Sequence, residues 1–242
     1  MPLKTTPIDA LLAARTPTPA LVNARQTRTT QLLAQLRSEI ITGRLAPDER
    51  LVLSTLCEQF GAGQTPLREA LLRLASEGLV VQEEQRGFSV APVSREELLD
   101  LTASRAEVDA LALRWSIENG DDHWEAQLLG TFHRLQKGNK INGDGHSIDM
   151  DWQSRHTDFH AALVAACPNQ VMLQLRAMLY ERSDRYRHLS VRYLRMPRDD
   201  RGEHEALMNA ALARDIPLAE KLIKQHIAHT SKVLLEEMEQ GH

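Results

Sequence analysis

The chain has 242 residues and a formal net charge of −4, with 42% apolar and 4% aromatic residues. This length allows one large or two modest domains, and the apolar content is sufficient for hydrophobic cores whose aliphatic character suits helical packing. The negative net charge excludes a protein that is basic throughout, so a DNA-binding function would depend on locally placed charge.

The cysteines and the distribution of apolar residues restrict the compartment. Cys57 and Cys167, the two cysteines, lie in apolar helical patterns, which excludes a disulfide framework and predicts buried free thiols in a reducing cytosol. No apolar run is long enough to span a bilayer, and the N-terminal segment lacks the apolar stretch typical of a secretion signal. We therefore expect a cytoplasmic protein with no membrane partner.

Residues 1–24 combine four prolines with small and polar residues. This composition predicts a flexible, arm-like segment. The alternative is an arm that packs on a partner subunit.

Residues 30–61 predict two helices separated by a turn. The first helix covers residues 30–42 and ends at Gly43, and a turn is expected before the second helix. Ser54 is expected to cap this second, short helix, which ends at Gly61. The inward-facing residues of the two helices are expected to be Leu32, Leu33, Leu36, Ile40, Ile41, Leu56, Cys57 and Phe60.

A third helix is predicted between Thr65, a favourable N-cap residue, and Gly78, a favourable C-terminal stop. Pro66 suits the first helical position. The expected buried face consists of Leu67, Ala70, Leu71 and Leu74. The other side carries polar residues able to pair with base edges and phosphates in a major groove, namely Gln64, Thr65, Arg68 and Arg73. Taken alone, this segment is explained equally well as an ordinary amphipathic helix.

Two β-prone runs lie next in the chain, at residues 79–81 and 88–90. The residues between them predict a hairpin whose tip is Arg86 and Gly87. Helix, helix, turn, helix and hairpin in this order predict a winged helix-turn-helix DNA-binding domain over residues 25–92.

Residues 93–240 show only helical periodicity in their strong patterns, which predicts an all-α bundle of six or seven helices and makes the protein mainly α. Ser94, with Glu97 three residues on, forms a capping box that opens the first of these helices. Asp121 or Asp122 is expected to cap the second. The later helices are expected at residues 148–166, 170–195, 203–214 and 217–239, with loops at 138–147 and 198–202.

Four histidines of this region are expected on inward faces of three helices: His156, His160, His204 and His226. Buried imidazoles need partners, and a divalent metal is a partner that several imidazoles can share. Neutral imidazole suits zinc, nickel, copper or iron. Each histidine taken singly is explained as well by a hydrogen-bonded core residue or a pocket lining, and the pattern alone does not establish that the three helices converge.

The stretches IITGRLAPDERL, TPLREALLRLASEGLV and RGFSVAPVS resemble the N-terminal DNA-binding domain of the GntR family of bacterial transcription regulators. The resemblance implies that Arg68 contacts DNA and that Arg86 and Gly87 belong to a wing that probes the minor groove. Members of the family commonly carry Ser-Arg before the Thr-Pro pair, where this chain has Gly63 and Gln64. The operator sequence therefore does not carry over.

The later stretches HTDFHAALVAACPNQVMLQL, EHEALMNAALARD and AEKLIKQHI resemble the FCD effector domain of FadR-type members of this family. In that domain an Asp or Asn, a His four residues later and two further His line a metal site. The matching positions are His156, His160, His204 and His226. His156 departs from the usual Asp or Asn, and an all-histidine site favours zinc or nickel over a hard metal.

The resemblance also implies a small carboxylate effector beside the metal. Arg105 matches an arginine that faces this pocket in the family, and Arg185 and Tyr186 of a later helix are expected to join it. Arg182 and Arg187 are expected on a solvated basic face. The stretches RHTDFHAALVAACPN and ERSDRYR resemble the subgroup of carbon-starvation-induced, glutarate-responsive repressors, which implies a dicarboxylate such as glutarate.

These features predict a homodimeric repressor that binds a double-stranded DNA operator and is controlled by the carboxylate. Two alternatives remain open. An enzyme would use the histidine cluster as a catalytic metal site, but Thr157 stands where a metalloprotease with this histidine spacing carries its general-base Glu. The other alternative is a bundle that serves only the dimerisation of a DNA-binding protein and binds no effector.

Overall fold

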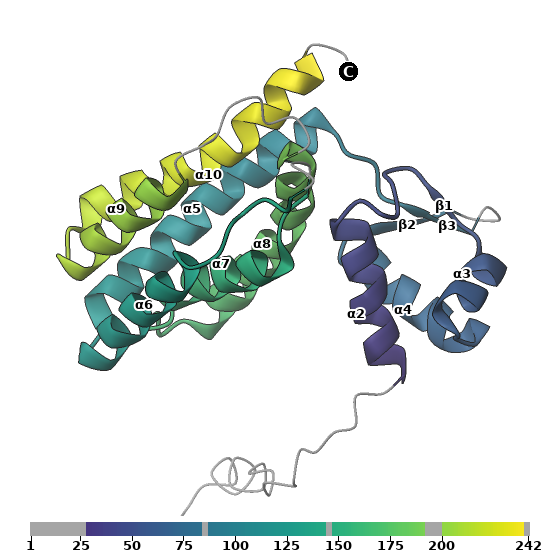
Figure 1. Cartoon of the computed structure of the whole chain (residues 1–242), viewed down its shortest axis with the longest axis horizontal. Helices are drawn as coiled ribbons and strands as arrows, with labels where there is room; N and C mark the ends of the chain where they lie inside the picture. Colours follow the sequence, from purple (N-terminus) through teal and green to yellow (C-terminus); the bar gives the residue numbers. More distant parts are fainter. Residues whose placement is uncertain (1–27, 84–86, 144–146, 192–199, 240–242) are drawn as a thin grey trace, which may run out of the picture.

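The computed structural model describes residues 28–83, 87–143, 147–191 and 200–239. Figure 1 shows that the chain forms two parts, which we call the winged part (α2 to β3) and the bundle (α5 to α10). The expected arm at residues 1–24 and Arg86 of the expected wing tip lie outside the described residues. None of the described helices is long and apolar enough to cross a membrane.

The winged part contains α2 (Arg28–Ile41), β1 (Arg50–Leu51), α3 (Leu53–Phe60), α4 (Gln64–Ser76), β2 (Val80–Glu83) and β3 (Gly87–Val90). β3 lies between β1 and β2 and pairs antiparallel with both. The core of this part is built from all three helices and the sheet, with Leu36, Ile40, Leu67, Leu71 and Val90 among its buried residues. The predicted order of helix, helix, turn, helix and hairpin is confirmed.

Two predicted helix starts in the winged part are wrong. α4 begins after Gly63 rather than at Thr65, and α3 begins after Val52 rather than Ser54. Pro66 lies in the first turn of α4, where backbone N–H groups have no intrahelical acceptor and a proline is tolerated at more than one position. The turn expected before α3 contains β1, whose two residues are too few to show an alternating pattern.

Both predicted glycine stops around the helix-turn-helix are confirmed. Gly61 comes after α3 with φ +58°, and Gly78 comes after α4 with φ +77°. These left-handed conformations favour glycine because it has no Cβ. The chain can therefore turn sharply after each of these two helices.

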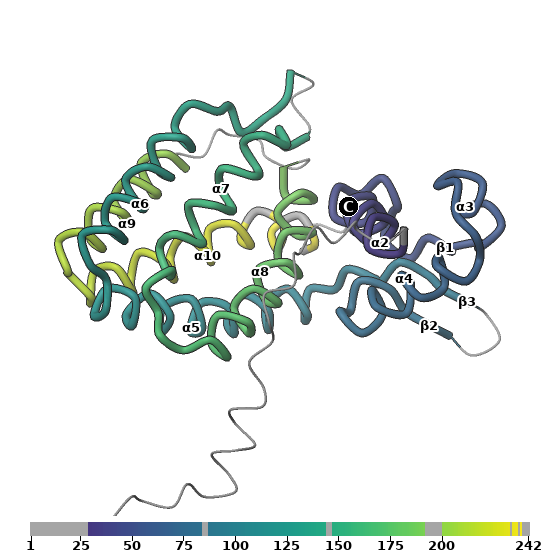
Figure 2. The backbone as a smooth tube through the Cα atoms, turned by 90° about the horizontal axis from the view of Figure 1, so that it is seen from below, coloured from purple at the N-terminus to yellow at the C-terminus, as the bar shows by residue number. Residues whose placement is uncertain are grey.

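The bundle consists of α5 (Arg95–Asn119), α6 (Asp122–Leu135), α7 (Met150–Leu163), α8 (Gln170–Val191), α9 (Asp200–Leu212) and α10 (Ile216–Glu239). α5 and α10 pack along each other, and α6 packs on α7 and α9 (Figures 1 and 2). α8 packs on α5 and also contacts α2. It is therefore a helix of the bundle that touches the winged part. The largest core cluster of the bundle includes Leu113, Ile117, Leu128, Phe159, Leu163 and Leu207.

Side-chain caps define helix starts in the bundle, among them those of α5, α6 and α7. Ser94 and Asp121 each accept a hydrogen bond from the backbone N–H three residues later at 2.9 Å, and Asp149 does so at 2.8 Å. The first cap was predicted, and the second resolves the choice between two aspartates. Because Asp149 caps α7, this helix begins later than the predicted range 148–166, and it also ends earlier. α9 begins within the predicted loop at 198–202.

Ser94 joins the winged part to the bundle, so its cap should contribute measurably to stability. We expect Ser94→Ala to lower the free energy of unfolding by about 1 kcal/mol, because the N–H of Glu97 loses its acceptor. Ser94→Asp, which keeps an acceptor, should stay close to the wild type. Urea denaturation followed by circular dichroism checks this, and equal midpoints for all three proteins would contradict the capping role.

Candidate metal centre and DNA-binding surface

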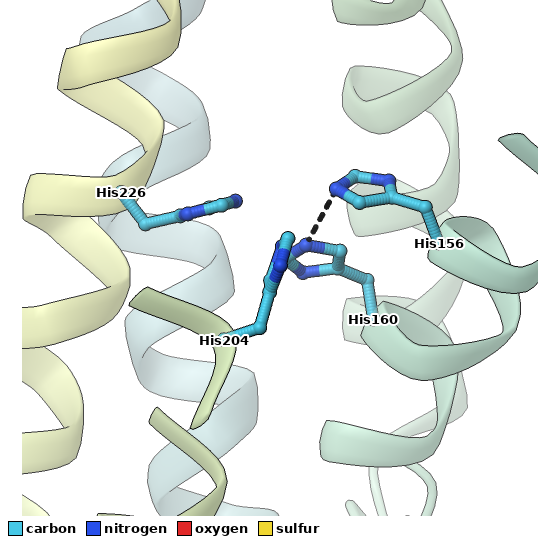
Figure 3. A group of neighbouring side chains, drawn as sticks. All are labelled: His156, His160, His204 and His226. Carbon is cyan, nitrogen blue, oxygen red and sulfur yellow. Dashed lines mark hydrogen bonds between the residues drawn. The ribbon is translucent and has the colours of Figure 1, made fainter. Parts of the chain in front are cut away.

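Four imidazoles meet inside the bundle, as the family resemblance implied. His156 and His160 come from α7, His204 from α9 and His226 from α10, and all four are at least nine-tenths buried. One nitrogen of each ring lies within 4.8 Å of the others. Figure 3 shows the rings from the three helices directed into one common space. The predicted convergence is therefore present in the described residues.

Aromatic packing on α7 holds these rings in place. The ring of Trp152 stacks on His156, with centroids 4.7 Å apart and planes at 25°. Phe159 meets His160 and His204 edge to face, at 5.4 and 5.3 Å. Because an i, i+4 pair projects from one helix face, the apolar face that buries Trp152 also carries both histidines inward.

Burial favours the neutral form of the two imidazoles of α7. It holds the pKa of His156 well below its ordinary value, and the positive charge of Arg187 and the neighbouring imidazoles act in the same direction. The pKa of His160 is also held well below its ordinary value, first by burial and then by His226, His204 and Arg105. Neutral imidazole is the form that binds a metal, so these two histidines need no deprotonation at neutral pH.

The donor set fits a borderline divalent cation. The group of possible ligands consists of four imidazoles, and no carboxylate or thiolate of the described residues belongs to it. Imidazole nitrogen suits zinc or nickel, whereas a hard cation prefers oxygen ligands. His160, His204 and His226 match the positions that the resemblance gives to histidine ligands. The identity of the metal stays a prediction.

An outer carboxylate orients one of these rings. Oε2 of Glu203 on α9 accepts a hydrogen bond from Nδ1 of His226 at 2.8 Å. The proton of His226 therefore lies on Nδ1, which leaves the lone pair of Nε2 for a metal. Sequence reasoning missed Glu203, although its place directly before His204 was a usable signal.

Three arginines surround the histidines. Arg105, Arg176 and Arg187 are each less than 9% exposed, and two of them share the buried carboxylate of Asp109, at 3.1 Å from Arg105 and 2.5 Å from Arg176. Asp184 pairs with Arg187 at 2.9 Å. Three guanidinium groups thus lie beside the histidines, and two of them share one carboxylate, so an anionic group could pair with them.

The expectation that Arg187 belongs to a solvated basic face is wrong. Its side chain is buried, and Nη1 donates a hydrogen bond to Nδ1 of His156. Tyr180, Asp184 and Arg187 lie on the same side of α8. Asp184 follows Tyr180 by four residues, and Arg187 follows Asp184 by three. This spacing was the available signal for an inward polar face, but solvated faces show the same spacing.

The structure brings two of the three predicted effector residues together. Arg105 and Tyr186 line one small cavity between α5, α8 and α10, with Arg187 beside them. The cavity volume is about 10 Å³, which is room for about one water molecule. The structure places Arg185 elsewhere, with its guanidinium donating to the carbonyl groups of Ala91 and Pro92. Arg185 thus connects α8 to the segment immediately after β3.

The predicted DNA-binding residues of α4 share its exposed side. Gln64, Thr65, Arg68 and Arg73 are all exposed, whereas Leu67, Ala70, Leu71 and Leu74 are buried. Gly87 is exposed at the start of β3, with φ +90°. These residues place polar side chains on the exposed side of α4 and an exposed glycine in the hairpin. Their contacts with DNA stay a prediction.

Comparison with known families agrees with both parts of the fold. Residues 28–90 match the bacterial regulatory proteins of the gntR family, and residues 100–229 match the FCD domain. The second match alone covers more than half of the chain. The two matched regions correspond to the winged part and the bundle.

Individual relatives lead to the same grouping. The chain is 38% identical over 196 residues to the HTH-type transcriptional repressor GlaR of Escherichia coli (strain K12), covering 79% of this chain and 89% of that relative. It is 35% identical over 201 residues to the HTH-type transcriptional regulator BphR of Paraburkholderia xenovorans (strain LB400), covering 83% and 82%. The solved structure of E. coli McbR/YncC aligns with a TM-score of 0.68 at 24% identity, over 88% of this chain and 98% of that one. This last likeness concerns the fold alone.

Removal of a central histidine should empty the metal centre. We expect His160→Ala to lose bound metal, because its ring lies nearest the middle of the cluster and is 1% exposed. His133→Ala changes an exposed histidine of α6 and serves as the control. The metal content per chain, measured by mass spectrometry after dialysis against zinc, checks this; equal content in the two variants would reject the site.

Proposed function

Because the chain belongs to the gntR family of bacterial regulatory proteins and carries an FCD domain, we propose that a metal and a small carboxylate bound in the bundle control the affinity of the winged part for DNA. The protein is a DNA-binding transcriptional repressor of this type, and its relatives are regulators rather than enzymes. The alternative of a catalytic metal site is therefore excluded.

α4 enters a major groove in this proposal. Gln64 and Thr65 approach base edges from the N-terminal end of α4, and Arg68 pairs with guanine or phosphate. Arg73 adds a phosphate contact one turn later. The hairpin around Gly87, with Arg86 beside it, reaches the adjacent minor groove. The observation in support is that the exposed face of α4 carries these polar residues, together with Leu72, while its opposite face is buried in the core.

A homodimer places two copies of α4 in successive major grooves of a near-palindromic operator, about 34–36 Å apart. The bundle offers a surface for this association. Val171, Leu175 and Met178 are exposed apolar residues of α8 at helical spacing. An apolar stripe of this kind is typical of a surface that another protein covers, and a second copy of the chain would do so.

The ligand is a small carboxylate, with a dicarboxylate such as glutarate as the first candidate. Arg105 and Arg187 line the cavity, and Arg187 also contacts His156; their guanidinium groups suit a carboxylate. Tyr186 lines the same cavity, and its hydroxyl group donates a hydrogen bond to the carboxylate of Glu97 at 2.7 Å. Zinc or nickel, when bound, would supply further positive charge and open coordination positions for the carboxylate.

One observation carries the proposed coupling: α8 contacts both the ligand site and the winged part. Arg187 and Tyr180 of α8 contact His156, whereas Arg185 of the same helix donates to the carbonyl groups of Ala91 and Pro92. A shift of α8 caused by the ligand would therefore displace the winged part. A coupling free energy of about 1–3 kcal/mol is sufficient for a 5- to 150-fold change in operator affinity.

Fluorescence anisotropy with the DNA upstream of the protein's own gene tests the function. We expect binding that is stronger than to a scrambled duplex and is released by glutarate or a similar diacid. Arg68→Ala should reduce binding to the level of the scrambled duplex, because the exposed α4 face loses its central guanidinium. Arg134→Ala, which changes an exposed arginine of α6, should bind as the wild type does.

Two results of this experiment would require revision. Retained operator affinity in Arg68→Ala would reject α4 as the reading helix. Selective DNA binding that no diacid weakens would keep the regulator and reject the ligand class.

Arg185 should affect the coupling rather than either binding event. We expect Arg185→Ala to bind operator and diacid separately, while the release of DNA by the diacid falls to less than about twofold. The reason is that the contacts from α8 to Ala91 and Pro92 are lost. Arg185→Lys, which keeps a charged donor, should retain part of the release. Anisotropy for DNA and calorimetry for the diacid measure the two affinities, and full release in Arg185→Ala would disprove this route.

A further inference from the structure

The helix α4 begins with an exposed amide side chain. Gln64 is its first residue, and the N-cap before it is Gly63, which has no side chain. Gly63 has φ −76°, which any residue adopts, and among the described residues the nearest atom that a Cβ there would meet is Cδ of Pro66, at 3.7 Å. The fold therefore does not require glycine at this position. Its effect is that the amide group of Gln64 is the foremost side chain of α4.

The surroundings of this helix tip are open. A groove of about 660 Å³ runs between α2, where Gln31 and Gln35 line it, and the start of α4, where Gly63 and Pro66 line it. These last two residues lie on either side of Gln64 in the chain. When α4 enters a major groove, the sugar-phosphate backbone that borders the groove has room on this side of the tip.

The chemistry of the amide selects one base. The carbonyl oxygen of Gln64 accepts hydrogen bonds and its NH₂ group donates them. In the major groove adenine presents the matching pair, since its N7 accepts and its N6 amino group donates. Guanine presents two acceptors, cytosine a donor, and thymine an acceptor beside a methyl group. Adenine is therefore the base that satisfies both ends of the amide at once.

The exposed neighbours of Gln64 do not duplicate this preference. Arg68 follows by four residues on the same side of α4, but its guanidinium group has donors alone and suits guanine or phosphate. The hydroxyl group of Thr65 donates and accepts through a single oxygen, so it does not span N6 and N7 of one base. Among these three side chains at the tip, the selection of adenine falls to Gln64.

We propose that Gln64 specifies an A·T base pair, once in each half-site of the operator, through two hydrogen bonds between its amide group and N6 and N7 of adenine. The inference rests on the proposed function, since it requires α4 in a major groove. It defines one position of the operator, and the other positions depend on further contacts and on DNA shape. Because the preference belongs to one side chain, exchange of that side chain should exchange the base.

Selection from a library of random duplexes gives the preferred sequence of each protein. We expect the wild type and Gln64→Arg to differ at one position of each half-site, with adenine for the wild type and guanine for the variant, because a guanidinium group pairs with O6 and N7 of guanine. Gln127→Arg adds the same charge to an exposed residue of α6 and should select the wild-type sequence. Identical sequences for the wild type and Gln64→Arg would overturn the inference, as would a change from a base other than adenine.

Base analogues in the selected operator test the two hydrogen bonds with the unchanged protein. 7-Deazaadenine lacks the N7 acceptor and purine lacks the N6 amino group, so each should weaken wild-type binding at least about fivefold. Gln64→Ala should bind the adenine operator and both analogue operators equally well. Fluorescence anisotropy at one fixed salt concentration measures these affinities. A wild type that is insensitive to either analogue, or a Gln64→Ala variant that stays sensitive to them, would disprove the paired contact.

The inference and the proposed function fail in different ways. If the wild type enriches no sequence from the library, the winged part does not read DNA and both are wrong. If the wild type enriches a sequence that Gln64→Arg leaves unchanged, the regulator stands and the role of Gln64 is wrong. The variants should unfold at the same temperature as the wild type, because Gln64 is exposed and lies outside the core of the winged part.

Discussion

The pairing of Asp109 with Arg105 and Arg176 is the interaction on which the polar centre of the bundle depends. The carboxylate is 1% exposed and accepts from both guanidinium groups, while Arg176 also donates to the backbone carbonyl of His160 at 3.0 Å. Unpaired charges at this depth would cost much of the stability of the fold. With the pairs formed, α5, α7 and α8 pack together around ionised groups, and His160 is held beside them.

The fold was predictable from the sequence because local signals and packing agree. In α4 the apolar spacing, the neighbouring glycines and the hairpin after it all indicate one arrangement. Helix starts were less certain, since Thr65 and Ser54 are good capping residues that the chain does not use as caps. The position at which a helix begins depends on all the residues of its first turn. Several of these residues can be suitable N-caps, so the sequence alone does not identify the one that is used.

The site was predictable in part. The i, i+4 spacing places His156 and His160 on one face, but no local rule brings His204 and His226 to the same point, and only the family resemblance implied it. Arg187 was misassigned because helical spacing shows that a face is polar without showing what the face contacts. A polar face that lines a charged interior and one that meets water have the same pattern. Tertiary contacts alone separate the two cases.

The small size of the cavity determines how such a site can act as a switch. A volume of about 10 Å³ beside Arg105 and Arg187 does not admit a diacid, so the ligand can enter only if α5, α8 and α10 separate. Because α8 also contacts the segment after β3 through Arg185, the separation that would admit the proposed ligand would move the winged part as well. A preformed cavity would bind the diacid without this movement and would leave operator affinity unchanged. In the proposed mechanism, the small volume of this cavity would thus couple binding of the carboxylate to release of DNA.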